Sequence, residues 1–159
     1  MSSKPSSSTT TASTTAAPPR EAGLIVRDLM TSRVFSLRPG NNLAAAYELM
    51  VNEHVRHVPI VDPAGDLVGL VTHRDLLRSG FIEGEELPST DVQEKLWRRK
   101  LREIMATEVE TTEPEADLRE AAVTLFENKL GCLPVVEGTR LVGILTEADF
   151  VRYFIERSS

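Results

Sequence analysis

Cysteine is scarce in this sequence, and long apolar runs are missing. Cys132 is the single cysteine among 159 residues, which excludes an internal disulfide and leaves no thiolate cluster for structural zinc. No segment approaches the roughly 20 apolar residues of a membrane span, and none has the apolar core of a signal peptide. We therefore expect a soluble, cytoplasmic protein with no membrane partner, in which Cys132 is a small buried residue.

Catalytic signatures are absent as well. The sequence contains no Walker A motif, no GxGxxG, no HExxH and no GxSxG. His54 and His57 are three residues apart, but they lack a third metal ligand nearby in the sequence. No nucleophile has an identifiable base. The sequence predicts a protein that is not an enzyme and that holds no metal.

The chain also lacks an excess of positive charge. Its 18 basic and 24 acidic residues give a formal net charge of -6, which argues against non-specific binding to nucleic acid. Residues 1–22 differ in composition from the rest, because residues 2–15 are almost all Ser and Thr. Such a segment has no apolar surface to bury, and we expect a disordered tail.

After the tail, the sequence is a duplication. At an offset of 75, residues 26–30 (VRDLM) align with residues 101–105 (LREIM). After a one-residue deletion the offset is 74, and residues 67–78 (LVGLVTHRDLLR) align with residues 141–152 (LVGILTEADFVR). Two repeats follow from this register, one at 23–79 and one at 101–159, with residues 80–100 between them.

Each repeat has the same pattern of predicted elements. Apolar residues at helical spacing predict amphipathic helices that begin after Asn42 and after Asp117, both good helix caps. Short runs rich in Val, Ile and Leu predict strands, and a last helix follows at His73 and at Glu147. The predicted strands are 57–61 and 67–72 in the first repeat, and 132–136 and 141–146 in the second.

These elements predict an α/β fold. A β-α-β-β-α unit of ~55 residues is too small to cover its own sheet, so the two copies should pack sheet to sheet with internal pseudo-two-fold symmetry. Between them, residues 84–92 (GEELPSTDV) read as a loop, and Thr90 with Gln93 should begin a helix that continues through Ile104. Arg98, Arg99, Lys100 and Arg102 form a basic cluster on that helix, a pattern more typical of a solvated face than of a nucleic-acid site.

One motif recurs in both repeats: Gly, two apolar residues, Thr, any two residues, and Asp. It occupies residues 69–75 and 143–149, and Val58-Pro59 and Leu133-Pro134 precede it. On these residues the chain resembles the CBS-domain family, over nearly everything after residue 23. The resemblance implies a regulatory module that binds AMP, ADP, ATP or S-adenosylmethionine, commonly forms a homodimer and acts on an effector protein.

The motif also has a physical interpretation. Thr72 and Thr146 lie where a strand leads into a helix, so free backbone N–H groups and the hydroxyl can bind a phosphate. Asp75 and Asp149, one turn later, present carboxylate oxygens that can accept from the hydroxyls of a ribose. Gly69 and Gly143 allow a ligand or a neighbouring backbone to come close. The alternative interpretation is that Thr-x-x-Asp is only a helix capping box.

The two copies of the site differ in charge. Arg56, His57, His73 and Arg74 surround the first motif, whereas Gly131, Cys132, Glu147 and Ala148 take their places in the second. The sequence therefore predicts that Thr72 and Asp75 belong to the tighter phosphate site, unless basic groups cross between the repeats. The candidate nucleotide-binding residues are Arg56, His57, Val58, Pro59, Gly69, Thr72, His73, Arg74, Asp75, Cys132, Leu133, Pro134, Gly143, Thr146 and Asp149.

Three functions remain open at this point. The first is a stand-alone sensor that binds an adenine nucleotide or a related adenosyl compound and changes the packing of its halves or of its dimer. The second is a structural dimerisation module whose motifs are helix caps, and which no nucleotide stabilises. The third is a nucleic-acid binder that uses the basic cluster near Arg98 and is sensitive to salt.

Overall fold

The computed structural model describes residues 23–79 and 90–158. The tail predicted at 1–22 and residues 84–89 of the predicted loop lie outside the described residues. No helix in the described part is both long and apolar enough to cross a bilayer.

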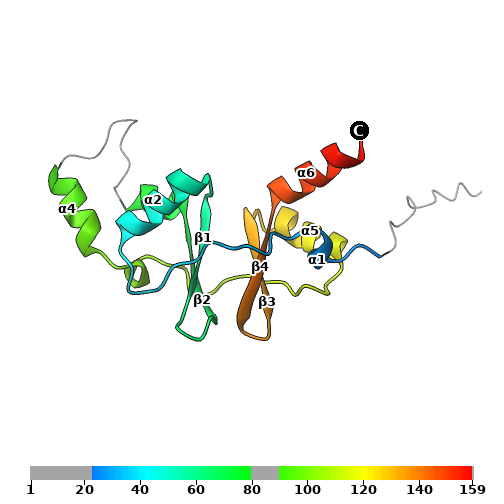
Figure 1. Ribbon diagram of the computed structural model, residues 1–159, viewed down its shortest axis with the longest axis horizontal. Helices are drawn as coiled ribbons and strands as arrows, with labels where there is room; N and C mark the ends of the chain where they lie inside the picture. The colour runs from blue at the N-terminus through cyan, green and yellow to red at the C-terminus, as the bar shows by residue number, and fades with distance from the viewer. Residues whose placement is uncertain (1–22, 80–89, 159) are drawn as a thin grey trace, which may run out of the picture.

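Two antiparallel hairpins lie side by side at the centre of the molecule, and helices flank them (Figure 1). The predicted hairpin strands and the helices that flank them are confirmed within one or two residues. The strands are β1 His57–Val61, β2 Leu67–Thr72, β3 Cys132–Glu137 and β4 Arg140–Thr146, and their flanking helices are α2 Leu43–Glu53, α3 His73–Arg78, α5 Leu118–Glu127 and α6 Glu147–Arg157.

Side-chain caps begin the two long helices of the repeats. The side chain of Asn42 accepts from the backbone N–H of Ala45 at 2.9 Å, and Asp117 accepts from that of Glu120 at 3.0 Å. Each bond satisfies one of the backbone donors that a helix leaves open in its first turn. The caps lie at the positions predicted from the sequence.

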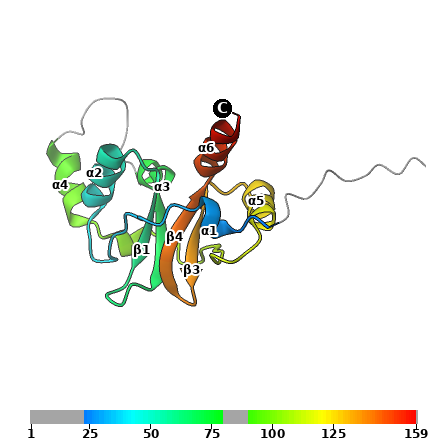
Figure 2. The ribbon, with the colours of Figure 1, turned by 45° about the vertical axis from the view of Figure 1, so that its right-hand side comes forward.

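The first turn of each repeat packs into the other repeat. Helix α1 (Val26–Leu29) lies beside α5 of the second half (Figure 2), and the fully buried Val26 joins the core around Leu133. The short 3-10 helix η1 (Leu101–Glu103) does the reverse, because the fully buried Leu101 completes the first core around Leu43. Each core therefore contains residues of both repeats.

After these turns, each chain segment crosses back beside the hairpin of the opposite repeat. Thr31 bridges Ile144 of β4, and Ala106 bridges Leu70 of β2, both in antiparallel sense. The first strand predicted for each repeat is reduced to such single bridges. A Cβ atom on Gly143 would lie 2.7 Å from Met30 Sδ, so this glycine makes room for the crossing segment. Of the two roles proposed for the motif glycines, close approach of a neighbouring backbone is the one observed.

The hairpins are also joined at their turns, which confirms that the two copies pack together. Leu67 donates its backbone N–H to the carbonyl of Thr139 at 2.9 Å, and the hydroxyl of Thr139 donates to Asp66 at 2.9 Å.

The helix predicted to run from Thr90 to Ile104 is shorter than expected. Helix α4 covers Thr90–Arg98, and the chain then changes direction. The cause is backbone pairing with the start of α2: Leu43 donates to the carbonyl of Arg99 at 3.1 Å, and Leu101 donates to that of Asn41 at 2.8 Å. A continuous helix cannot make these bonds and also bury Leu101 in the first core.

The crossing segments provide a test of the fold. A Cβ on Gly69 would lie 2.7 Å from Met105 Sδ and 3.0 Å from the carbonyl oxygen of Ala106, so Gly69→Ala should destabilise the protein by about 1–3 kcal/mol. A Cβ on Gly40 would meet only Arg102 Nη2, at an ordinary 3.6 Å, and Gly40→Ala is the matched control. Urea unfolding measures both; equal stability of the two variants would contradict this account of the glycine.

Candidate functional site

A cleft of about 540 Å³ opens where residues 31–35, the start of β1 and the start of α6 meet. It contains the second motif together with residues of the first repeat. Its lining residues are Thr31, Arg33, Val34, Phe35, His54, Val55, Arg56, His57, Gly131, Ile144, Thr146, Glu147, Ala148, Asp149 and Arg152.

Asp149 is the buried acceptor of this cleft, at 4% exposure. Its Oδ2 accepts from the backbone N–H of Thr146 at 2.8 Å and from the hydroxyl of Thr146 at 3.1 Å. Its Oδ1 accepts from the hydroxyl of Thr31 at 3.3 Å and from Nη2 of Arg152. Both carboxylate oxygens are therefore already bonded to the protein.

Arg56 and His57 lie in the cleft of the second motif. The sequence grouped them with Thr72 and Asp75, whereas in the structure both line the cleft of Thr146 and Asp149. Basic residues of the first repeat thus line the cleft of the second motif, the crossing that the sequence left open, while the backbone of His57 pairs with Thr72. The ranking of the two motifs by affinity stays a prediction.

His57 stands between the two motifs. Its backbone pairs with Thr72 in the hairpin, while a Cβ atom on Gly131 would overlap its imidazole ring. Burial, followed by the charge of Arg56, lowers the pKa of His57, and the carboxylates of Glu147 and Asp75 act in the opposite direction. A glycine at 131, where the first repeat has arginine, provides the space for this ring.

Three arginines, two carboxylate residues and apolar residues line the cleft. Arg33 and Arg152, which the sequence prediction did not include, line it with Arg56, and the carboxylate residues are Glu147 and Asp149. Guanidinium groups bind phosphate with charge-assisted hydrogen bonds. Phe35 and Val55 provide apolar surface for a flat ring. Arg33 was missed because it lies outside the motif and its counterpart at the offset of 75 is Glu108.

The first motif forms a helix cap. Asp75 Oδ2 accepts from the backbone N–H of Thr72 at 2.8 Å and from its hydroxyl at 2.9 Å, and Thr72 Oγ1 accepts from the backbone N–H of Asp75 at 3.2 Å. Thr72, His73 and Asp75 are half-buried and Arg74 is exposed. None of these four lines either of the two hollows described in this section.

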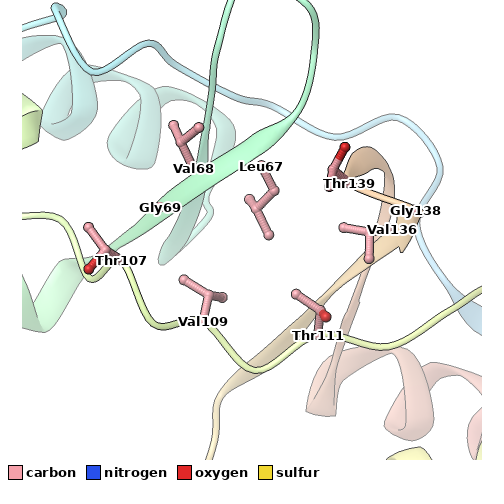
Figure 3. A pocket seen from close by; sticks show the side chains of 9 residues that line it. All are labelled: Leu67, Val68, Gly69, Thr107, Val109, Thr111, Val136, Gly138 and Thr139. Atoms are coloured by element: carbon pink, nitrogen blue, oxygen red, sulfur yellow. The ribbon is translucent and has the colours of Figure 1, made fainter.

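A second hollow, of about 190 Å³, lies near the turns of the hairpins (Figure 3). Its lining residues are Leu67, Val68, Gly69, Thr107, Val109, Thr111, Val136, Gly138 and Thr139. Gly69 is the only predicted site residue among them. This lining has hydroxyl and apolar groups but no charged side chain, so it does not match the predicted phosphate site.

The remaining candidate residues are buried in the strands. Val58, Pro59, Leu133 and Pro134 are fully buried, and Gly143 is buried beneath the crossing segment. Cys132 is 4% exposed, and burial raises the pKa of its thiol to about 12. The interpretation of Cys132 as a small buried residue is confirmed.

The lowered pKa of His57 makes a prediction about stability. Because the unfolded chain takes up this proton at a higher pH than the folded chain, the free energy of unfolding falls as the pH drops from about 6.5 toward the folded pKa. Removing the imidazole with His57→Gln should therefore flatten the fall of the Tm over that window. Thermal melts at about pH 7.5 to 5 measure this, with exposed His54→Asn as control. Parallel curves for all three proteins would contradict it.

With the geometry established, the chain can be compared with known proteins. The sequence profile described as CBS domain matches residues 26–81 and 101–156. A Vibrio cholerae protein named AcuB is 36% identical over 84% of this chain and 92% of its own, with a TM-score of 0.72. CBSX2 of Arabidopsis thaliana, solved in complex with AMP, is 29% identical over 86% of this chain and 100% of its own, also with a TM-score of 0.72. YhcV of Bacillus subtilis is 27% identical over 78% of this chain and 81% of its own.

Other curated relatives are much longer than the matched segment. Three that match 80–82% of this chain, at 29–31% identity, include it as 32%, 23% and 41% of their own lengths. The chain thus spans less than half the length of these relatives.

Proposed function

The chain belongs to the CBS-domain family, and from that premise we propose that it is a regulatory module that binds an adenine nucleotide or a related adenosyl compound. We place the ligand in the cleft of Thr146 and Asp149. The observation that carries the proposal is the convergence of Arg33, Arg56 and Arg152 on one cleft. Because the formal net charge of the chain is -6, an anion must be held by such a local group of cations.

The rest of the cleft fits the same ligand class. Thr146 caps α6, an 11-residue helix whose first turn favours an anion, whereas α3 has only six residues. Phe35 and Val55 suit an adenine ring. CBSX2, a relative at 29% identity, binds AMP, which supports this ligand class. Regulation would follow if the ligand binds one arrangement of the two halves, or of a dimer, more tightly than another. The effector protein would sense that change.

Two arginines distinguish the cleft of the second motif from the helix cap of the first. Arg33 lines the cleft of Thr146, whereas Arg74 lies beside Asp75 in the first motif. We expect Arg33→Ala to weaken AMP binding about tenfold through loss of a charge-assisted bond, and Arg74→Ala to leave it nearly unchanged. Isothermal titration calorimetry with AMP, ADP, ATP and S-adenosylmethionine measures this. The opposite pattern would place the phosphate at Asp75.

A structural module without a ligand is the second candidate function. The observation that favours it is that Asp75 and Asp149 both hold the backbone N–H of their own threonine, as helix caps do. A ligand at a hundred times its Kd stabilises the folded protein by about 2.7 kcal/mol. If none of the four ligands raises the Tm at millimolar concentration, the sensor proposal fails and the structural module stands.

We also propose that the chain forms a homodimer through its helices. Apolar side chains are exposed at equivalent positions of both repeats. Val51 aligns with Phe126, and Leu77 aligns with Val151. Phe154 adds to this surface from α6, and the four helices lie toward the end of the molecule opposite the hairpin turns (Figure 2). A surface repeated by pseudo-two-fold symmetry can match a second copy of itself.

The dimer can be tested with charged substitutions. Phe126 is 84% exposed and Phe154 is 73% exposed. The double variant Phe126→Glu/Phe154→Glu should sediment as a monomer, because it places charges on the proposed interface. Exposed Ala64, in the turn between β1 and β2, supplies the control Ala64→Glu, which should remain dimeric. Sedimentation velocity measures both, and a wild-type protein that stays monomeric at all concentrations would rule out the homodimer.

A further inference from the structure

Arg152 links the cleft to the buried carboxylate of Asp149. Its guanidinium forms an ion pair with Oδ1 of Asp149, while its side chain is 60% exposed and lines the cleft. The hydroxyls of Thr31 and Thr146 and the backbone N–H of Thr146 also donate to this carboxylate, so both of its oxygens are hydrogen-bonded. Asp149 itself is 4% exposed. A ligand hydroxyl that approaches Asp149 therefore meets a carboxylate whose two oxygens already accept hydrogen bonds from the protein.

The equivalent carboxylate of the first repeat differs. Arg78 has the place of Arg152, yet among the described residues it forms no ion pair with Asp75. Ala106 has the place of Thr31 and lacks a hydroxyl. Within the same described part of the chain, Oδ1 of Asp75 accepts no hydrogen bond, and Asp75 is half-buried rather than buried. The duplication thus provides an internal comparison for the effect of Arg152.

We infer that Arg152 makes the cleft selective for adenosyl ligands that carry a phosphate, an inference that rests on the proposed function. The ribose hydroxyls of any such ligand need the Oδ1 acceptor that Arg152 holds. A neutral ligand such as adenosine displaces the guanidinium from Asp149 and supplies no anion in its place. A nucleotide displaces it too, but its phosphate replaces the carboxylate as the partner of the guanidinium.

The position of Arg152 allows this exchange. Because its side chain lines the cleft with Arg33 and Arg56, the displaced guanidinium remains next to the place where these cations attract a phosphate. A ligand with a cationic sulfonium in place of the phosphate supplies no anion that these three arginines could bind. Arg152 therefore acts as a specificity-determining residue that disfavours unphosphorylated adenosyl compounds.

The test compares adenosine with AMP on the variant Arg152→Met, which keeps an apolar stem and removes the charge. Adenosine affinity should rise about three- to tenfold, because no ion pair has to be broken. AMP affinity should fall about tenfold, because the phosphate loses a partner. Arg78→Met, the matched change in the first repeat, should leave both affinities unchanged. Calorimetry on the full chain gives the six dissociation constants of the wild type and the two variants.

A second variant, Arg152→Gln, keeps a donor for Asp149 without the charge and covers the case in which Arg152→Met misfolds. Its adenosine affinity should also rise and its AMP affinity should also fall, both by a smaller factor. A parallel loss of adenosine and AMP affinity, or an unchanged adenosine affinity, would overturn the inference. Wild-type protein that binds neither ligand would instead refute the proposed function, so the two failures are distinguishable.

Discussion

The exchange of starting segments between the repeats is the constraint on which the rest of the structure depends. Val26 and Leu101 are both fully buried, each in the core built mainly by the other repeat. Because burying such a side chain is worth about 1.5–3 kcal/mol, neither half completes its core without its neighbour. The exchange also brings Thr31 and Arg33 to the second hairpin, where they line the cleft. The same packing that stabilises the fold therefore builds the site.

Sequence reasoning predicted the local structure because local signals determine it. Short apolar runs bounded by Pro and Gly gave β1 and β2 with the bounds that the structure has, and Asn42 and Asp117 marked the helix starts. The helix predicted to continue through Leu101 was the exception. Its periodicity was correct to Arg98, but backbone pairing of Arg99 and Leu101 with the start of α2 is a tertiary contact that periodicity cannot indicate.

The candidate cleft was predicted only in part, for a similar reason. The motif marked Thr146 and Asp149, which line it, but a strand pattern says which face a side chain occupies and not which half of a pseudo-symmetric pair it meets. Arg56 and His57 precede the first motif in sequence and lie in the cleft of the second. Arg33 had no sequence signal, because an isolated arginine in a segment without clear periodicity resembles any solvent-exposed residue.

Comparison of the repeats shows where the duplication has diverged. Strand positions keep their apolar character, as with Val58 and Leu133, because both are fully buried and any polar replacement would need a hydrogen-bond partner. Cleft positions differ in charge or size, as with Arg56 against Gly131 and His57 against Cys132. These differences support one another: the imidazole of His57 occupies space that only glycine at 131 leaves open. The cleft therefore combines basic residues of the first repeat with a glycine of the second that makes room for them.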